Sequence, residues 1–267
     1  MSSRAVPLPL MAARAYLPDM RFASHKTLQR PALPAGERIY AVGDIHGRRD
    51  LLDKLLKRID KDLNAWKGKS RIVFLGDYID RGPDSAAVLD RLVEGPGPAD
   101  AWICLKGNHD HFAHYMLTTE NWQQHHLDTW LANGGDEAMR SWGIPSRIVR
   151  SDPDAAVAAL KECVPAEHGE FLARLRLSYR AGDYMFVHAG IRPGIPLEQQ
   201  DERDLLWIRS DFLNHRHDFG AHVVHGHTIT RTVDARPNRT GIDTGAYASE
   251  RLTALVLEGA ERRVLST

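Results

Sequence analysis

The sequence has little cysteine, no long hydrophobic run and no excess charge. Its 267 residues include two cysteines, Cys104 and Cys163, so we expect no disulfide framework and a reducing, cytoplasmic setting. No stretch approaches the roughly 20 apolar residues of a membrane-spanning helix, and we expect no membrane partner. Lysine plus arginine number 35, as do aspartate plus glutamate. This balance argues against bulk binding of nucleic acid.

The N-terminal residues 1–36 have no helical pattern. Prolines interrupt the stretch at five positions, and proline breaks a helix interior. The apolar run from Ala5 to Met11 contains two of these prolines, which makes a poor signal-peptide core. We predict a flexible arm over 1–36, with an over-extended start or a targeting segment as the alternatives. No linker or repeat divides residues 37–267, which we expect to form one domain.

From residue 38 onward the chain repeats an order of strand, polar loop and helix. We expect strands at 38–42, 71–75 and 101–105 and helices around 51–59 and 85–93. Three such units in a row predict a parallel sheet with right-handed crossovers. Ligands of such sheets bind at the carboxyl ends of the strands.

The second half of the chain has a different pattern. Residues 111–176 are mostly helical in pattern and are predicted to form a helical insertion. Its three tryptophans, Trp122, Trp130 and Trp142, are expected in the core rather than along a substrate wall. Five short strands then follow, at 177–180, 184–187, 223–225, 240–242 and 252–257. They predict a second sheet, mixed or antiparallel.

Candidate metal-binding and acid–base residues follow five of the predicted strands. They are Asp44, His46, Asp77, Asp80, Asn108, His109, His188 and His227. A single aspartate after a strand is usually a helix cap, and a single histidine usually has a structural role. Five strand ends that all carry such residues are hard to explain by capping. Carboxylate, amide and imidazole ligands suit manganese, iron or zinc.

Five motifs in this order resemble a known family. They are GDIHG at 43–47, GDYIDRG at 76–82, GNHD at 107–110, HAG at 188–190 and HGHT at 225–228. The set resembles the calcineurin-like metallophosphoesterases and, within them, the bacterial branch of the phosphoprotein phosphatase (Ser/Thr protein phosphatase) family. The resemblance extends over residues 39–257. It implies a four-layer α/β/β/α sandwich with a dinuclear metal centre, so that 37–267 would be a single catalytic domain.

The resemblance implies six metal ligands: Asp44, His46, Asp77, Asn108, His188 and His227. Asp44 and His46 would bind the first ion, Asp77 would bridge both, and the other three would complete the second site. We expect two divalent cations, manganese first and iron or zinc as alternatives. Two carboxylates and a bridging hydroxide carry three negative charges against four positive ones. The remaining positive charge would attract a phosphate.

The resemblance also implies the roles of four further residues. His109 would protonate the leaving oxygen, and Asp80 would hold and polarise His109. Arg81 and Arg209 would bind the phosphate oxygens through bidentate hydrogen bonds. An ion pair with Arg81 is the alternative role for Asp80. The assignment of Arg209 depends on the segment LLWIR at 205–209, and a solvated surface charge is its alternative.

Two residues near the later motifs have open roles. Asp243 follows a late strand and would either orient a metal-bound histidine or form a turn. His225 lies two residues before His227, so both would point the same way on a strand. The family pattern places the ligand after Gly226, and His225 is expected to be a neighbour only.

The function expected from the resemblance is a metal-dependent phosphomonoesterase. It would act on phosphoserine or phosphothreonine in proteins, with dual specificity or a small phosphoester also open, by direct attack of a dimetal-bound hydroxide. One alternative is a symmetrical diadenosine tetraphosphate hydrolase, which typically lacks the aspartate found here as Asp80. Another is an inactive protein-binding scaffold. The sequence departs from the eukaryotic protein phosphatases at two places. Asp110 stands where they usually have glutamate, and residues 234–239 lack their Tyr-Cys pair. The substrate, the regulatory partners and the oligomeric state therefore stay open.

Overall fold

The computed structural model describes residues 30–267 and contains two five-stranded sheets. The first sheet has the order β10-β9-β1-β2-β3. Its strands are β1 (Glu37–Val42), β2 (Lys69–Phe74), β3 (Ala101–Cys104), β9 (Thr253–Glu258) and β10 (Glu261–Ser266). Strands β1, β2 and β3 are parallel to one another, as the strand–loop–helix order predicts.

The second sheet is mixed and has the order β4-β5-β6-β8-β7. Its strands are β4 (Ser178–Ala181), β5 (Tyr184–Val187), β6 (His222–His225), β7 (Asp234–Ala235) and β8 (Arg239–Gly241). Strands β5, β6 and β8 are parallel, and β4 and β7 are antiparallel to their neighbours. The sequence indicated four of these five strands, and β7 was missed.

The prediction that residues 252–257 belong to the second sheet is wrong. This segment is β9, and it pairs antiparallel with β1 in the first sheet. A run of apolar residues identifies a strand but carries no information about its partner. The edge strand β10 was not predicted, because its residues from Glu261 to Val264 are exposed and lack an apolar face.

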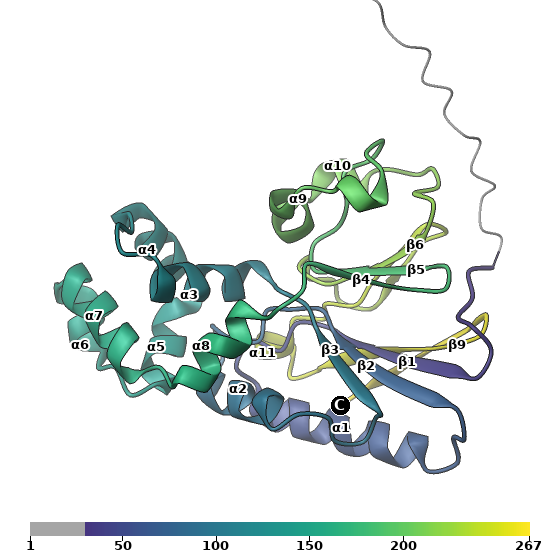
Figure 1. Ribbon diagram of the computed structural model, residues 1–267, viewed down its shortest axis with the longest axis horizontal. Coiled ribbons are helices and arrows are strands. Elements are labelled where there is room, and N and C mark those ends of the chain that lie inside the picture. The colour runs from purple at the N-terminus through teal and green to yellow at the C-terminus, as the bar shows by residue number, and fades with distance from the viewer. Residues whose placement is uncertain (1–29) are drawn as a thin grey trace, which may run out of the picture.

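Helices cover the outer face of each sheet, so the expected four-layer order is confirmed (Figure 1). Helices α1 (Arg49–Leu63) and α2 (Ser85–Val93) lie against the first sheet. Helices α9 (Glu202–Trp207) and α10 (Ser210–Leu213) lie against the second. A 3₁₀ turn (Leu197–Gln199) precedes α9, and the short helix α11 (Ala246–Ser249) precedes β9.

The alternation of side chains along β1 divides the core between two layers. Tyr40 and Val42 pack with the buried leucines of α1. Ile39 and Ala41 point the other way and pack against the second sheet. Successive residues of a strand face opposite sides of the sheet, so a fully apolar strand requires a layer on each face.

The helical insertion follows β3 and lies at one end of the sheets (Figure 1). It comprises α3 (Asn108–Thr118), α4 (Gln124–Trp130), a kinked connection (Leu131–Gly135), α5 (Asp136–Ser141), α6 (Ser146–Ser151), α7 (Pro153–Cys163) and α8 (Ala166–Ala173). Trp130 and Trp142 are buried there and Trp122 is partly buried, as expected.

The described end of the predicted arm packs onto the domain. The Leu33 N–H donates to the Gly259 carbonyl at 2.9 Å, and the Tyr184 hydroxyl donates to the Pro31 carbonyl at 2.9 Å. Residues 31–36 therefore differ from the flexible segment that the sequence predicted. The prediction for residues 1–29 lies outside the described residues. Within residues 30–267, no helix combines the length and the apolar character needed to cross a membrane.

Candidate metal centre

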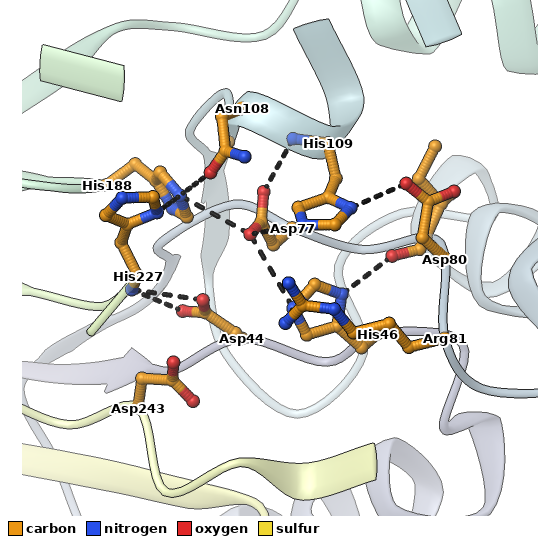
Figure 2. Close-up of polar contacts among 12 residues, drawn as sticks. Asp44, His46, Asp77, Asp80, Arg81, Asn108, His109, His188, His227 and Asp243 are labelled. Atoms are coloured by element: carbon orange, nitrogen blue, oxygen red, sulfur yellow. Dashed lines mark hydrogen bonds and ion pairs between the residues drawn. The ribbon is translucent and has the colours of Figure 1, made fainter. Parts of the chain in front are cut away.

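The loops after β1, β2, β3, β5 and β6 meet at one edge of the two sheets (Figure 2). They bring together all six residues predicted to bind metal, each at most 8% exposed: Asp44, His46, Asp77, Asn108, His188 and His227. Asp77 lies at the centre. Its Oδ2 is 3.6 Å from His46 Nε2 and 3.4 Å from His188 Nε2.

Two groups of potential ligand atoms share Asp77. One contains His46, Asp77 and His109, and the other contains Asp77, His188 and His227, with ligand atoms within 4.8 Å of one another in each group. A carboxylate shared between two groups suits a pair of divalent cations, whose mutual repulsion needs an anionic bridge.

The tautomer of His188 supports a cation at the second group. Its Nδ1 lies 2.9 Å from the carbonyl oxygen of Leu75, which can only accept, so Nδ1 carries the hydrogen. Burial lowers the pKa of His188, so the ring is neutral and Nε2 holds a lone pair. That atom lies 2.9 Å from Asn108 Oδ1 and 3.4 Å from Asp77 Oδ2. Three electron-rich atoms therefore converge with no hydrogen between them, which fits a metal site.

His46 presents its Nε2 lone pair to the first group in the same way. Its Nδ1–H donates to the Ile79 carbonyl at 2.8 Å, and burial holds its pKa well below the ordinary value. Backbone acceptors of this kind fix the tautomer of metal-binding histidines. Nε2 accepts a hydrogen bond from Arg81 Nη1 at 3.0 Å.

Crowded carboxylates give the site an unbalanced negative charge. Burial, followed by the nearby Asp243 and Asp77, raises the pKa of Asp44 well above its ordinary value. Burial also raises the pKa of Asp243, to about 6. Buried like charges disfavour ionisation, and cations at this edge would remove the penalty. The carboxylate, amide and imidazole donors fit first-row divalent metals.

The backbone of the site is strained. Six residues other than glycine have a positive φ within 30–267, and five of them belong to the site: His46 (47°), Asp77 (53°), Asp80 (72°), Arg81 (66°) and His227 (60°). Left-handed conformations cost energy for residues with a Cβ and cluster at functional sites. Gly107 relieves crowding nearby, since a Cβ there would lie 2.1 Å from Asp77 Oδ1.

His109, a member of the first group, also forms a buried pair with Asp80 (Figure 2). The Nδ1–H of His109 donates to Asp80 Oδ2 at 2.6 Å. Its Nε2 faces the centre, 3.9 Å from Asp77 Oδ2. Burial opposes protonation of His109, but Asp77 and Asp80 outweigh it and raise the pKa of His109 above its ordinary value. His109 therefore has the protonation and direction of a proton donor.

Two predicted phosphate-binding residues lie at the mouth of the site. The Arg81 guanidinium carbon is 4.9 Å from the centre of the Tyr247 ring. Arg209 donates from Nη1 to Thr228 Oγ1 at 3.3 Å, beside His227. Asp80 bonds to His109 and Trp130, and no ion pair in the described part of the chain joins it to Arg81.

The two residues with open roles lie outside the ligand groups. Asp243 Oδ1 accepts from the Gly245 N–H at 2.8 Å, which is the turn interaction. His225 Nδ1 lies 3.0 Å from the Gly226 carbonyl, and its ring packs against Phe212. His225 is thus a buried neighbour of the site, as expected.

Sequence reasoning missed three residues of the site: Asp110, Trp130 and Tyr247. The Asp110 carboxylate accepts from the N–H groups of Gly107, Asp77 and Tyr78 at 2.8, 2.8 and 3.1 Å, and so ties two ligand loops together. Its place at the start of α3, three residues after Gly107, is a capping position and could have revealed it. The other two carry no local signal.

Comparison with known proteins agrees with this geometry. The family profile of calcineurin-like phosphoesterases matches residues 37–245. Serine/threonine-protein phosphatase 1 of Salmonella typhimurium is 30% identical over 221 residues, which are 80% of this chain and 89% of that protein. The symmetrical bis(5'-nucleosyl)-tetraphosphatase of Methylococcus capsulatus is 34% identical over 158 residues, but these are 58% of this chain and only 44% of that protein.

A solved structure shares the fold at low sequence identity. The crystal structure of a candidate diadenosine tetraphosphatase has a TM-score of 0.58 and 22% identity, and the match covers 88% of this chain and 98% of that one. The profile and the Salmonella phosphatase both match most of the present sequence. The chain therefore belongs to the calcineurin-like phosphoesterases, a family of metal-dependent hydrolases.

Proposed function

We propose that this phosphoesterase is a phosphomonoesterase that acts on phosphoserine and phosphothreonine in proteins. Its metal ligands would be the six buried residues at the sheet edge: Asp44, His46, Asp77, Asn108, His188 and His227. When bound, two divalent cations would supply an activated water and offset the charge of the phosphoryl group. Manganese is the proposed metal, with iron or zinc as alternatives.

The arginines at the mouth of the site would bind and orient the substrate. Arg81 reaches His46 Nε2, so its guanidinium already lies over the ligand groups. Arg209 is held next to His227 by its bond to Thr228. A guanidinium gives two parallel charge-assisted hydrogen bonds to phosphate oxygens. Together they would hold the phosphoryl group with its leaving oxygen toward His109.

The observation that carries this proposal is the bond between His109 and Asp80. An alkoxide from serine or threonine is a strongly basic leaving group and needs a proton as the P–O bond breaks. The Nε2–H of His109 would give that proton, while Asp80 fixes the ring through Nδ1. Cleavage of a polyphosphate releases a far less basic phosphate, which has little need of a donor.

The groove beside the site has room for more than a phosphate. It has a volume of about 620 Å³ and is lined by Tyr247, Ile229, Arg231 and Arg251 among others. No member of the ligand groups lines this groove, but Tyr247 adjoins both, since its ring centre lies 5.5 Å from that of His46. The arginines suit negative groups of the substrate beyond the phosphoryl group that is transferred. Acidic residues of a phosphopeptide would meet this requirement.

A symmetrical dinucleoside tetraphosphatase is the second candidate function. It is supported by the relatives of that name, and a polyphosphate chain would also suit the arginines of the groove. The test is to reconstitute the protein with manganese and to measure kcat/KM for a phosphoserine/phosphothreonine peptide and for diadenosine tetraphosphate. A preference for the peptide supports the proposal, and a preference for the dinucleotide overturns it. Turnover of neither by metal-loaded protein would indicate a scaffold.

A further inference from the structure

The helical insertion contributes a hydrogen bond to the acid–base pair. Trp130 ends α4, is fully buried, and donates its indole N–H to Asp80 Oδ2 at 2.8 Å. This is the same oxygen that accepts from His109 at 2.6 Å. The other oxygen, Oδ1, is buried without a partner among residues 30–267. Both hydrogen bonds to the carboxylate therefore converge on the atom that faces His109.

The residues after Trp130 form a hydrogen bond with the backbone of Arg81, the residue that follows Asp80. Leu131–Gly135 join α4 to α5 across a kink at Gly134, whose backbone is not helical and has a φ of 98°. The Gly134 carbonyl accepts from the Arg81 N–H at 3.1 Å. A Cβ on Gly134 would lie 2.8 Å from both Cγ and N of Arg81, so only glycine fits.

The contacts from Trp130 and Gly134 are made to two residues with an unfavourable backbone conformation. Asp80 and Arg81 are consecutive and both left-handed, with φ of 72° and 66°. A left-handed conformation is unfavourable for a residue with a Cβ and persists only when its surroundings enforce it. The Asp80 N–H also donates to the Oγ of Ser85, the first residue of α2, at 3.0 Å. The contacts to the Asp80 carboxylate and to the Arg81 N–H, however, come from the insertion.

We propose that residues 130–135, the bracing turn, position the catalytic apparatus, with Trp130 a positioning residue that acts through Asp80. The inference rests on the proposed function, in which Asp80 orients the proton donor His109. The indole N–H fixes which carboxylate oxygen faces His109 and stabilises its charge in a buried setting, where an unpaired charge is costly. The Gly134 carbonyl fixes Arg81. The helical insertion would then be part of the catalytic machinery as well as a cover over one end of the sheets.

Trp130→Phe tests the proposal because it removes the N–H and keeps most of the ring volume. The matched control is Trp142→Phe. Trp142 is a buried tryptophan of the same insertion, and its indole N–H bonds to His168, away from the site. Two substrates of similar shape separate the roles. Phenyl phosphate has a basic leaving group that needs a proton, and p-nitrophenyl phosphate has a weakly basic one that does not.

We expect Trp130→Phe to lower kcat on phenyl phosphate by about 10-fold, a fraction of the 10²–10⁴-fold that a general acid contributes. On p-nitrophenyl phosphate kcat should change by less than about 2-fold, with KM unchanged on both. Trp142→Phe should show no difference between the substrates. An equal loss on both substrates in Trp130→Phe, or no loss, would overturn the proposal, because a packing defect does not depend on the leaving group.

A second variant keeps the test decisive if Trp130→Phe fails to fold. Gly134→Ala places a methyl group against Arg81 and leaves the indole in place. We expect it to raise the inhibition constant for inorganic phosphate at least about 5-fold, with bound metal unchanged by elemental analysis. Unchanged phosphate inhibition would reject the role of the bracing turn. Wild-type protein that hydrolyses neither aryl phosphate would instead reject the proposed function.

Discussion

His188 Nε2 and Asn108 Oδ1 lie 2.9 Å apart with no hydrogen between them, because the hydrogen of the neutral His188 ring is on Nδ1. Two lone pairs at this distance repel each other. A cation that accepts both would turn the repulsion into two bonds. Metal binding should therefore stabilise the folded state. The gain should be larger than at a site whose ligand atoms do not repel one another before the metal binds.

Metal removal should lower the thermal stability. At 100 times Kd each site contributes about 2.7 kcal/mol, which for a domain of this size corresponds to roughly 5–10 °C in Tm. Differential scanning fluorimetry of chelator-treated protein, with and without added manganese, measures the shift. Titration calorimetry should show two equivalents bound. A Tm that does not respond to either treatment would contradict a metal centre at this edge.

Asp77→Asn should lose activity while the protein stays folded. The neutral amide cannot bridge two cations. Removal of a residue that only hydrogen-bonds to a metal ligand typically lowers activity roughly 10–100-fold, and the loss of kcat in Asp77→Asn should be larger. Elemental analysis should show a reduced metal content, and circular dichroism an unchanged spectrum. Asp128→Asn, at an exposed position of α4, is the control. Near-normal turnover by Asp77→Asn would exclude the two-metal arrangement.

Activity on substrates with basic leaving groups should fall with rising pH. The proposed proton donor is the protonated form of His109, whose pKa is raised above its ordinary value although burial opposes this, because Asp77 and Asp80 favour the charged ring. The contribution of the proton donor is therefore full below that pKa and is lost above it. Asp80→Asn removes one negative partner and should move the decline to lower pH. The kcat–pH profile on phenyl phosphate measures this, and an unmoved profile would show that Asp80 does not act on His109.

Removal of Arg81 should weaken phosphate binding. A hydrogen bond to a charged group is worth about 1.5–3 kcal/mol, so Arg81→Ala should raise the inhibition constant for inorganic phosphate by about 10–100-fold. Arg209→Ala should act in the same direction. Arg140→Ala serves as the control, because Arg140 pairs with Asp136 and Glu137 on the insertion surface. Equal inhibition constants for phosphate in all three variants would show that Arg81 and Arg209 do not bind the phosphate.

Charge reversal in the groove should affect large substrates alone. Arg231 is exposed and lines the groove, and exposed charge pairs contribute up to about 1 kcal/mol each. Arg231→Glu should raise KM for an acidic phosphopeptide by up to about 10-fold and leave KM for phenyl phosphate unchanged. Arg147→Glu, at an exposed position of α6, controls for net charge. An equal effect on both substrates would place Arg231 outside the substrate path.

The sequence alone determined the parallel core of the first sheet and the residues at its edge. Each strand–loop–helix unit is local, and polar residues such as Asp44 and Asn108 stand directly where a strand ends. Parallel strands bring their carboxyl ends together, so such residues could be placed at one edge without coordinates. Distinguishing His227 from His225 required the family pattern, because both alternate to the same face.

Only the tertiary structure decided which distant segments support the site. Trp130 meets Asp80 across 50 residues, and Tyr247 reaches His46 from the short helix before β9. Neither contact leaves a periodic or motif signal, because it depends on how the insertion and the last loops pack on the sheets. The same reason explains the error over β9. Hydrophobic pattern determines that a segment buries its side chains, whereas the packing of the whole chain determines its neighbour.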